Sequence, residues 1–168
     1  MSKREKRNYI KLGIILLVTI IIAVVIANLY HNYDNNKANK SYISKYVSSI
    51  QCKDLSNAML ELSGQNYLYI SYTGNKNIFE MEKRLRKVLK QNDLEDNFMF
   101  VDCSSDINEE NHVSYLKDLL TVGNRELVLP AIIYFKDVTP TDYIDSANGL
   151  IDEADFVQLL DQYEVNKK

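Results

Sequence analysis

Apolar residues along this chain form one long uninterrupted run and several shorter runs with two different spacings. The long run extends from Leu12 to Tyr30 and contains no charged residue. Shorter runs of about five apolar or β-branched residues are typical of buried strands, whereas apolar residues at three- and four-residue spacing indicate helices. The predicted strands are 47–51, 67–72, 98–102, 131–135 and 143–147. The predicted helices are 53–62, 77–91, 112–120 and one that begins after residue 152.

The long apolar run predicts a transmembrane helix. Its 19 residues make a helix of roughly 28 Å, close to the hydrocarbon thickness of a bilayer. Five Lys and Arg residues precede it, which by the positive-inside tendency places the N-terminus in the cytoplasm. A cleaved signal peptide is the alternative, but its apolar region is shorter and ends in a small-x-small site, and Ala27-Asn28-Leu29 is a poor one.

This interpretation divides the chain into an anchor and one exterior domain. We expect a cytoplasmic tail at 1–8, the transmembrane helix at 9–30, a linker at 31–45 that is flexible or frayed up to Lys40, a single domain at 46–165 and a short tail at 166–168. The chain after Lys11 has 15 basic and 22 acidic residues. Its negative net charge argues against nucleic acid as a partner.

Two local signals refine the element boundaries. Asn77 followed by Glu80 predicts a capped start for the second helix of the domain, and Asp152 predicts the cap of the last helix. Pro140 is expected in a loop between the last two strands.

The order βαβαβαββα, a parallel unit followed by a hairpin and a terminal helix, resembles the thioredoxin fold across the whole exterior domain. Leu129-Pro130 opens the fourth strand and 134–137 ends it, as in that superfamily. The segments 50–55 and 67–70 resemble extracytoplasmic thioredoxin-like proteins grouped with bacteriocin transport accessory proteins. The resemblance implies an α/β fold with a central mixed sheet, and a cis Leu129–Pro130 bond that lies against the turn before the second helix.

That turn lacks the chemistry that the resemblance implies for it. Redox-active relatives carry a Cys-x-x-Cys after the second strand, where this chain has Thr73-Gly74-Asn75-Lys76-Asn77. Thiol–disulfide exchange requires an attacking thiolate and a resolving thiol, and none of these side chains supplies either. We therefore expect no thioredoxin-type oxidoreductase activity at this site.

The two cysteines, Cys52 and Cys103, lie elsewhere. Cys52 follows the first predicted strand and Cys103 ends the third, and in a thioredoxin-like sheet these strands are parallel neighbours. An exterior domain permits a disulfide there if the two Cα atoms are close enough. The alternative is two unpaired, partly buried side chains.

Other candidate chemistry is weak. His31 and His112 lack the neighbouring ligands of a metal site, and the acidic loop with Asp102, Asp106, Glu109 and Glu110 lacks the spacing and glycine of a calcium loop. We expect no metal and no cofactor. A set of cations on the second helix predicts a solvated face or a docking face for an acidic partner: Lys83, Arg84, Arg86, Lys87 and Lys90.

Two functions remain. The first is a non-enzymatic binding or assembly module, in which Thr73–Asn77 together with Leu129 and Pro130 holds an extended protein or peptide segment by backbone hydrogen bonds. The second is a thiol-based redox protein or sensor that uses Cys52 and Cys103. The sequence favours the first.

Overall fold

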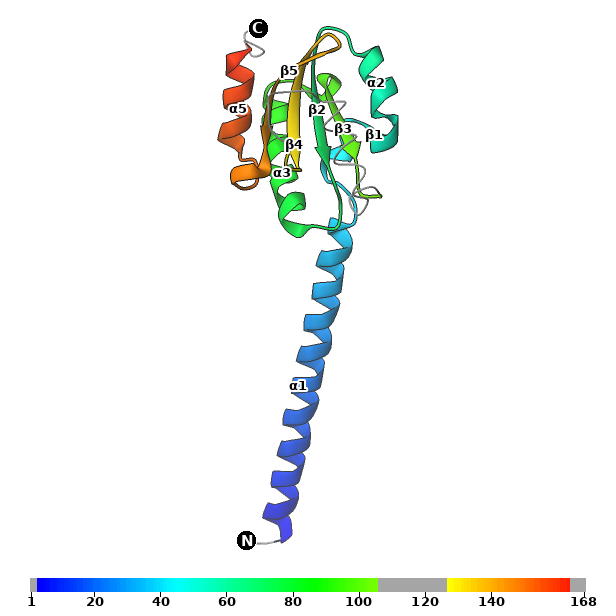
Figure 1. The fold of residues 1–168 in the computed structure, drawn as a ribbon. Coiled ribbons are helices and arrows are strands. Elements are labelled where there is room, and N and C mark those ends of the chain that lie inside the picture. Colours follow the sequence, from blue (N-terminus) through cyan, green and yellow to red (C-terminus); the bar gives the residue numbers. More distant parts are fainter. Residues whose placement is uncertain (1–2, 106–126, 164–168) are drawn as a thin grey trace. The chain divides into compact units, whose positions relative to one another are not determined.

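A computed structural model describes residues 3–105 and 127–163 of the chain (Figure 1). The predicted helix at 112–120 lies outside these residues. The chain divides into two compact units, 1–37 and 38–168.

The described part of the first unit is helical and belongs to α1 (Lys3–Ala38), whose last residue is the first of the second unit. An 18-residue stretch between Lys11 and Ala38 has a mean hydropathy of 3.0, and the helix is long and apolar enough to cross a membrane. The segment predicted as a flexible or frayed spacer up to Lys40 is helical as far as Ala38. The segment after Tyr30 is polar but contains neither Gly nor Pro up to that point, so an established helix extends through it one residue at a time.

The second unit is built around a five-stranded mixed sheet of order β1-β3-β2-β4-β5. β1, β3 and β2 are mutually parallel neighbours, and β4 and β5 run antiparallel to their neighbours. The strands are β1 (Ser48–Gln51), β2 (Gln65–Ser71), β3 (Phe98–Asp102), β4 (Ala131–Lys136) and β5 (Thr139–Asp145). The expected mixed sheet is confirmed.

Helices cover both faces of this sheet. α2 (Leu55–Glu61) lies on one face, and α3 (Lys76–Gln91) and α5 (Glu153–Gln162) lie on the other (Figure 1). Alternate side chains of the buried strands face opposite ways. In β2, the fully buried Tyr67 and Tyr69 face α3 and α5, whereas the fully buried Leu68 and Ile70 face α2.

The two faces differ in composition, and we call them the aromatic face and the aliphatic face. The aromatic face includes Tyr67, Tyr69, Phe98, Phe100, Tyr134 and Phe156. The aliphatic face includes Leu55, Met59, Leu68, Ile70, Val101 and Ile133, together with both cysteines and the buried ring of Phe135.

The last strand differs from its prediction. β5 begins at Thr139 and ends at Asp145, so Pro140 lies inside the strand and not in a loop. Its missing N–H is tolerated because β5 is an edge strand, and the pairing of β4 with β5 shifts register between Tyr134 and Phe135, next to the Phe135–Pro140 pair. The predicted cap at Asp152 is confirmed, since Asp152 and Asp155 form a capping box at the start of α5.

Candidate functional site

The residues that the sequence singled out meet at one edge of the sheet. The carboxyl ends of the parallel strands β1, β3 and β2 lie at this edge, together with the amino end of the antiparallel strand β4. Cys52, Cys103 and Thr73–Asn77 follow the first three strands, and Leu129-Pro130 precedes the fourth. The pairing of Ile70 with Ala131 brings Pro130 level with the end of β2.

The turn after β2 is held by an asparagine cap. The backbone of Asn75 is extended, and its side-chain oxygen accepts hydrogen bonds from the N–H groups of Asn77 (2.9 Å) and Ile78 (3.3 Å). The predicted cap at Asn77 is therefore wrong by two residues. Gly74 has φ = +87°, a conformation that favours glycine, and this tight turn lets the helix begin at Lys76.

Thr73, at the start of this turn, is the last member of a chain of hydrogen bonds. The Asp102 carboxylate accepts from the Ser104 hydroxyl and from the Ser104 N–H (2.9 Å). Ser104 Oγ lies 2.9 Å from Thr73 Oγ1 and accepts from the Thr73 N–H (2.8 Å). Because the single Ser104 hydroxyl proton goes to Asp102, the Thr73 hydroxyl must be the donor to Ser104. The arrangement orients the turn and contains no thiol.

The loop before β4 is fixed by residues that follow β5. The Leu129–Pro130 peptide bond is cis, as the resemblance implied. The Val128 N–H donates to the Asp145 carboxylate (3.2 Å) and the Val128 carbonyl accepts from the Ser146 N–H (3.0 Å). Ser146 Oγ donates to the carbonyl of buried Pro130 (2.8 Å). Between these fixed groups, the N–H and C=O of Leu129 make no hydrogen bond to another described residue.

Cys52 and Cys103 form a disulfide, with Cα atoms 4.8 Å apart. The sequence left open whether the two cysteines are bridged or unpaired, and in the structure they are bridged. Cys52 is 0% exposed and Cys103 is 2% exposed, and both pack within the aliphatic face. The Cys103 N–H also donates to the carbonyl of Ser71 (2.9 Å), which continues the sheet beyond its last regular pair. The bridge thus lies at the same sheet edge as the turn, but inside the core.

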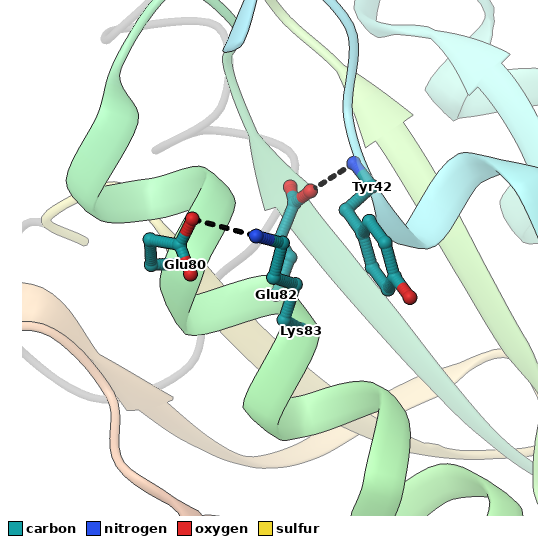
Figure 2. A network of polar contacts seen from close by, with 4 residues as sticks. All are labelled: Tyr42, Glu80, Glu82 and Lys83. Atoms are coloured by element: carbon teal, nitrogen blue, oxygen red, sulfur yellow. Dashed lines mark hydrogen bonds and ion pairs between the residues drawn. The ribbon is translucent and has the colours of Figure 1, made fainter. Parts of the chain in front are cut away.

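Sequence reasoning missed a buried carboxylate beside this edge. Glu82 on α3 is 1% exposed. One of its oxygens accepts from Ser41 Oγ (2.9 Å) and from the N–H groups of Tyr42 and Ile43, and the other accepts from Tyr69 OH (3.1 Å). Figure 2 shows the bond from the Tyr42 N–H. Burial raises the pKa of Glu82, and the hydrogen bonds from the first three groups and Tyr69 partly offset that rise. The sequence signal that could have revealed this site is the acidic residue Glu82 at a position within the apolar stripe of α3.

Glu82 fixes the segment that leads into the domain. This segment comprises residues 38–44 and is called the 38–44 segment. Its Ser41 and Ile43 are buried, and its Ala38 carbonyl accepts a 2.7 Å hydrogen bond from the Gly74 N–H. The predicted linker at 31–45 therefore ends in residues that belong to the core of the domain, and one of them contacts the backbone of the candidate turn.

Metal ligands do not gather within the described part of the chain, where no group of three or more His, Cys, Asp and Glu side chains could hold an ion. Three residues of the predicted acidic loop, Asp106, Glu109 and Glu110, lie outside the described residues, as does His112.

Comparisons with known proteins identify the fold. No known family pattern and no curated protein matches the sequence. Among solved structures, thioredoxin f2 of Chlamydomonas reinhardtii aligns with a TM-score of 0.51 at 13% identity, over 72% of this chain and 99% of that protein. A putative oxidoreductase with a thioredoxin fold gives 0.49 at 13% identity, over 71% and 97%, and a Plasmodium falciparum thioredoxin gives 0.47 at 14%, over 70% and 99%. At such low identity the likeness shows the fold alone, and this chain has a thioredoxin-like fold.

Proposed function

We propose that this chain is a membrane-anchored, extracytoplasmic and redox-inactive thioredoxin-like domain that acts as a binding or assembly module. α1 supplies the anchor, and the five Lys and Arg residues before its apolar stretch support a cytoplasmic N-terminus. Its ligand is an extended segment of another protein, held at the edge formed by Thr73–Asn77 and Leu129-Pro130. The similarity of 50–55 and 67–70 supports placement near the bacteriocin-transport-accessory type.

The absence of a thiol at the turn supports the non-redox part of this proposal. Thr73 and Asn75 are committed to hydrogen bonds with Ser104 and with the start of α3. Neither side chain exchanges electrons with a disulfide. Both cysteines of the chain are joined to each other inside the core.

The observation that carries the binding part is the backbone of Leu129. Its N–H and C=O have no partner among the described residues, while the groups on either side are fixed through Val128 and Pro130. A pre-ordered and unsatisfied N–H and C=O pair beside a sheet is what an extended peptide needs for backbone pairing. Rigid neighbours lower the entropic cost of that pairing.

The disulfide itself favours the second candidate, a redox sensor that uses Cys52 and Cys103. Reduction would release the end of β1 from the end of β3 and so change the edge where the proposed ligand binds. Burial of both sulfur-bearing residues opposes this candidate, because a sensor cysteine needs access to its oxidant or reductant. Alkylation of the native protein in mild reductant separates the two: a sensor is labelled rapidly, whereas a structural bridge is labelled only after unfolding.

A position-specific crosslinking experiment tests the binding proposal. A photoreactive phenylalanine analogue replaces the exposed Val128 beside Leu129, and the matched control carries it at the exposed Val138, in the turn between β4 and β5. We expect a discrete crosslinked partner from position 128 and none from 138. Equal labelling from both positions, or none from 128, would contradict the proposal.

Two further assays address activity and topology. The full chain should neither reduce insulin nor oxidise dithiols, and turnover that disappears in the Cys52→Ser/Cys103→Ser variant would overturn the redox-inactive assignment. Protease added to intact cells should digest the domain and leave the tail before Lys11 protected. A protected domain would contradict the extracytoplasmic location.

A further inference from the structure

The cations of this acidic chain are concentrated on one helix. The chain after Lys11 has 15 basic and 22 acidic residues, whereas α3 alone has six Lys and Arg against two Glu. The remainder therefore has nine basic and 20 acidic residues. Such segregation creates a local positive potential on a molecule that is otherwise negative, which favours association with a complementary acidic surface.

The cations lie mainly along one side of α3. Phe79, Lys83, Arg86 and Lys90 follow each other at spacings of four, three and four residues, which places them on one face of a helix, and Lys87 borders them. Lys87 and Lys90 are exposed, and neither has an ion pair within the described residues. Arg84, on the flank of the exposed surface away from Phe79 and Arg86, is also exposed.

Aromatic rings from the neighbouring segment complete this face. The Arg86 guanidinium lies 4.3 Å from the centroid of the Tyr46 ring, and Tyr46 lies 5.5 Å from the ring of Tyr42. The Tyr42 ring meets Phe79 edge-on at 5.6 Å, and Lys83 Nζ lies 4.8 Å from the Phe79 ring. These cations and rings adjoin one another, and we call the set, in which Phe79 is a buried member, the α3 face: Tyr42, Tyr46, Phe79, Lys83, Arg86, Lys87 and Lys90.

The charge of this face is only partly neutralised. Lys83 pairs with Glu80 at 2.7 Å, and Arg86 Nη2 pairs with Glu95 at 2.6 Å. The Nε and Nη1 groups of Arg86 have no hydrogen-bond partner among the described residues, but they are buried, so the accessible charge of the face comes from Lys87 and Lys90. Tyr46 is 42% exposed, so an apolar ring is presented together with the exposed cations Lys87 and Lys90. Tyrosine and arginine are the residue types that most often dominate binding energy at protein interfaces.

We propose that the α3 face is a docking surface for an acidic segment of a partner protein, distinct from the edge formed by Thr73–Asn77 and Leu129-Pro130. Carboxylates of the segment pair with Lys87 and Lys90, and an apolar residue packs against Tyr46. Buried Glu82 positions the surface, because it holds the backbone at Tyr42 and Ile43 against α3.

A fluorescent peptide of alternating Glu and Leu residues is the probe, and it is titrated against the full chain in neutral detergent. We expect binding that weakens as salt is added, because exposed charge pairs are screened. The same peptide with Gln in place of Glu should bind at least fivefold more weakly. Lys87→Gln should weaken binding of the Glu peptide about threefold, and Tyr46→Ala about fivefold.

Arg84→Gln is the matched control, since it removes one exposed cation from the same helix on the flank away from Phe79 and Arg86. It should leave the affinity within the error of the measurement. Equal losses from Arg84→Gln and Lys87→Gln, or equal affinity for the Glu and Gln peptides, would overturn the proposal. Tighter binding of short-chain phosphatidylglycerol that is lost in Lys87→Gln would instead assign the face to an anionic lipid surface.

Discussion

The two faces of the sheet are stabilised in different ways, although the same strands supply both. On the aromatic face, α3 and α5 pack over rings such as Tyr67, which contacts Tyr134 at 5.3 Å and Phe156 at 5.9 Å between ring centroids. On the aliphatic face, the helix among the described residues is α2, which is seven residues long. The Cys52–Cys103 disulfide fixes the chain just before this helix begins. A two-turn helix is unstable alone, so its position depends on packing and on the bridge.

Each face also fixes one end of the edge strand β1. Glu82, from the aromatic face, binds the 38–44 segment that leads into β1. The Cys52–Cys103 bridge, on the aliphatic face, holds the residue that follows β1. The comparison teaches that a four-residue edge strand, which has little area of its own to bury, is held by a polar anchor before it and a covalent anchor after it.

The largest expected effect comes from removing a ring on the aromatic face. Phe156→Ala should lower the free energy of unfolding by about 4 kcal/mol, because Phe156 is fully buried and contacts both Tyr67 and Phe98. Met59→Ala on the aliphatic face, where the side chain is 9% exposed, should cost about 2 kcal/mol. Urea denaturation of the full chain in detergent measures both. Equal losses would remove the distinction between the faces.

Removing the bridge should have the next largest effect. Cys52→Ser/Cys103→Ser should lower the free energy of unfolding by about 3 kcal/mol, since the bridge closes a loop in the unfolded chain across a sequence separation of 51. The fold should remain intact. Hydrogen exchange should increase in α2 and around β1 and change little in α5. Faster exchange spread evenly over both faces would contradict a local role for the bridge.

A third prediction concerns the polar anchor. Glu82→Gln should lower the free energy of unfolding by about 2 kcal/mol, because an amide offers one acceptor oxygen where the carboxylate offers two to Ser41, Tyr42, Ile43 and Tyr69. Glu80→Gln, at an exposed position on the same helix, is the matched control and should cost little. Urea denaturation compares the two variants. If Glu80→Gln lowered the free energy of unfolding by as much, the loss of a buried hydrogen-bond acceptor would not be the cause.

Glu82 should also make stability depend on pH. Its pKa is raised in the folded protein, so the folded state binds the Glu82 proton more tightly than the unfolded state does. Wild type should therefore lose stability relative to Glu82→Gln as the pH rises from about 4.5 through the raised pKa. The difference in unfolding free energy between the two chains, measured across this interval, isolates Glu82 from the exposed carboxylates that both share. An increase with pH would show that the hydrogen bonds outweigh burial.

The smallest expected effect tests the start of α3. Asn75→Ala should cost about 1 kcal/mol, because it removes the acceptor for the N–H groups of Asn77 and Ile78. Asn77→Ala should change the unfolding free energy by a few tenths of a kcal/mol at most, since Asn77 lies within the helix and is exposed. Thermal denaturation resolves the pair. A larger loss of stability from Asn77→Ala than from Asn75→Ala would instead support Asn77 as the cap, as the sequence pattern predicted.

The sequence by itself determined the elements whose signals are local. The strand at 98–102 and the cap at Asp152 were predicted as observed, because each depends on residues next to one another in the chain. The cis bond before Pro130 followed from resemblance. The missing thiol at Thr73–Asn77 also needed no structure, since thiol exchange is a property of the side chain.

Only the tertiary structure decided which residues meet across the fold. It paired Cys52 with Cys103, because the parallel register of β1 and β3 brings together two residues that are far apart in sequence. It buried Glu82, whose partners Ser41 and Ile43 lie about 40 positions earlier, a separation that helical periodicity does not encode. Local propensity indicates which secondary structures a segment can form. Hydrogen-bond partners and burial are set by the segments that pack against it.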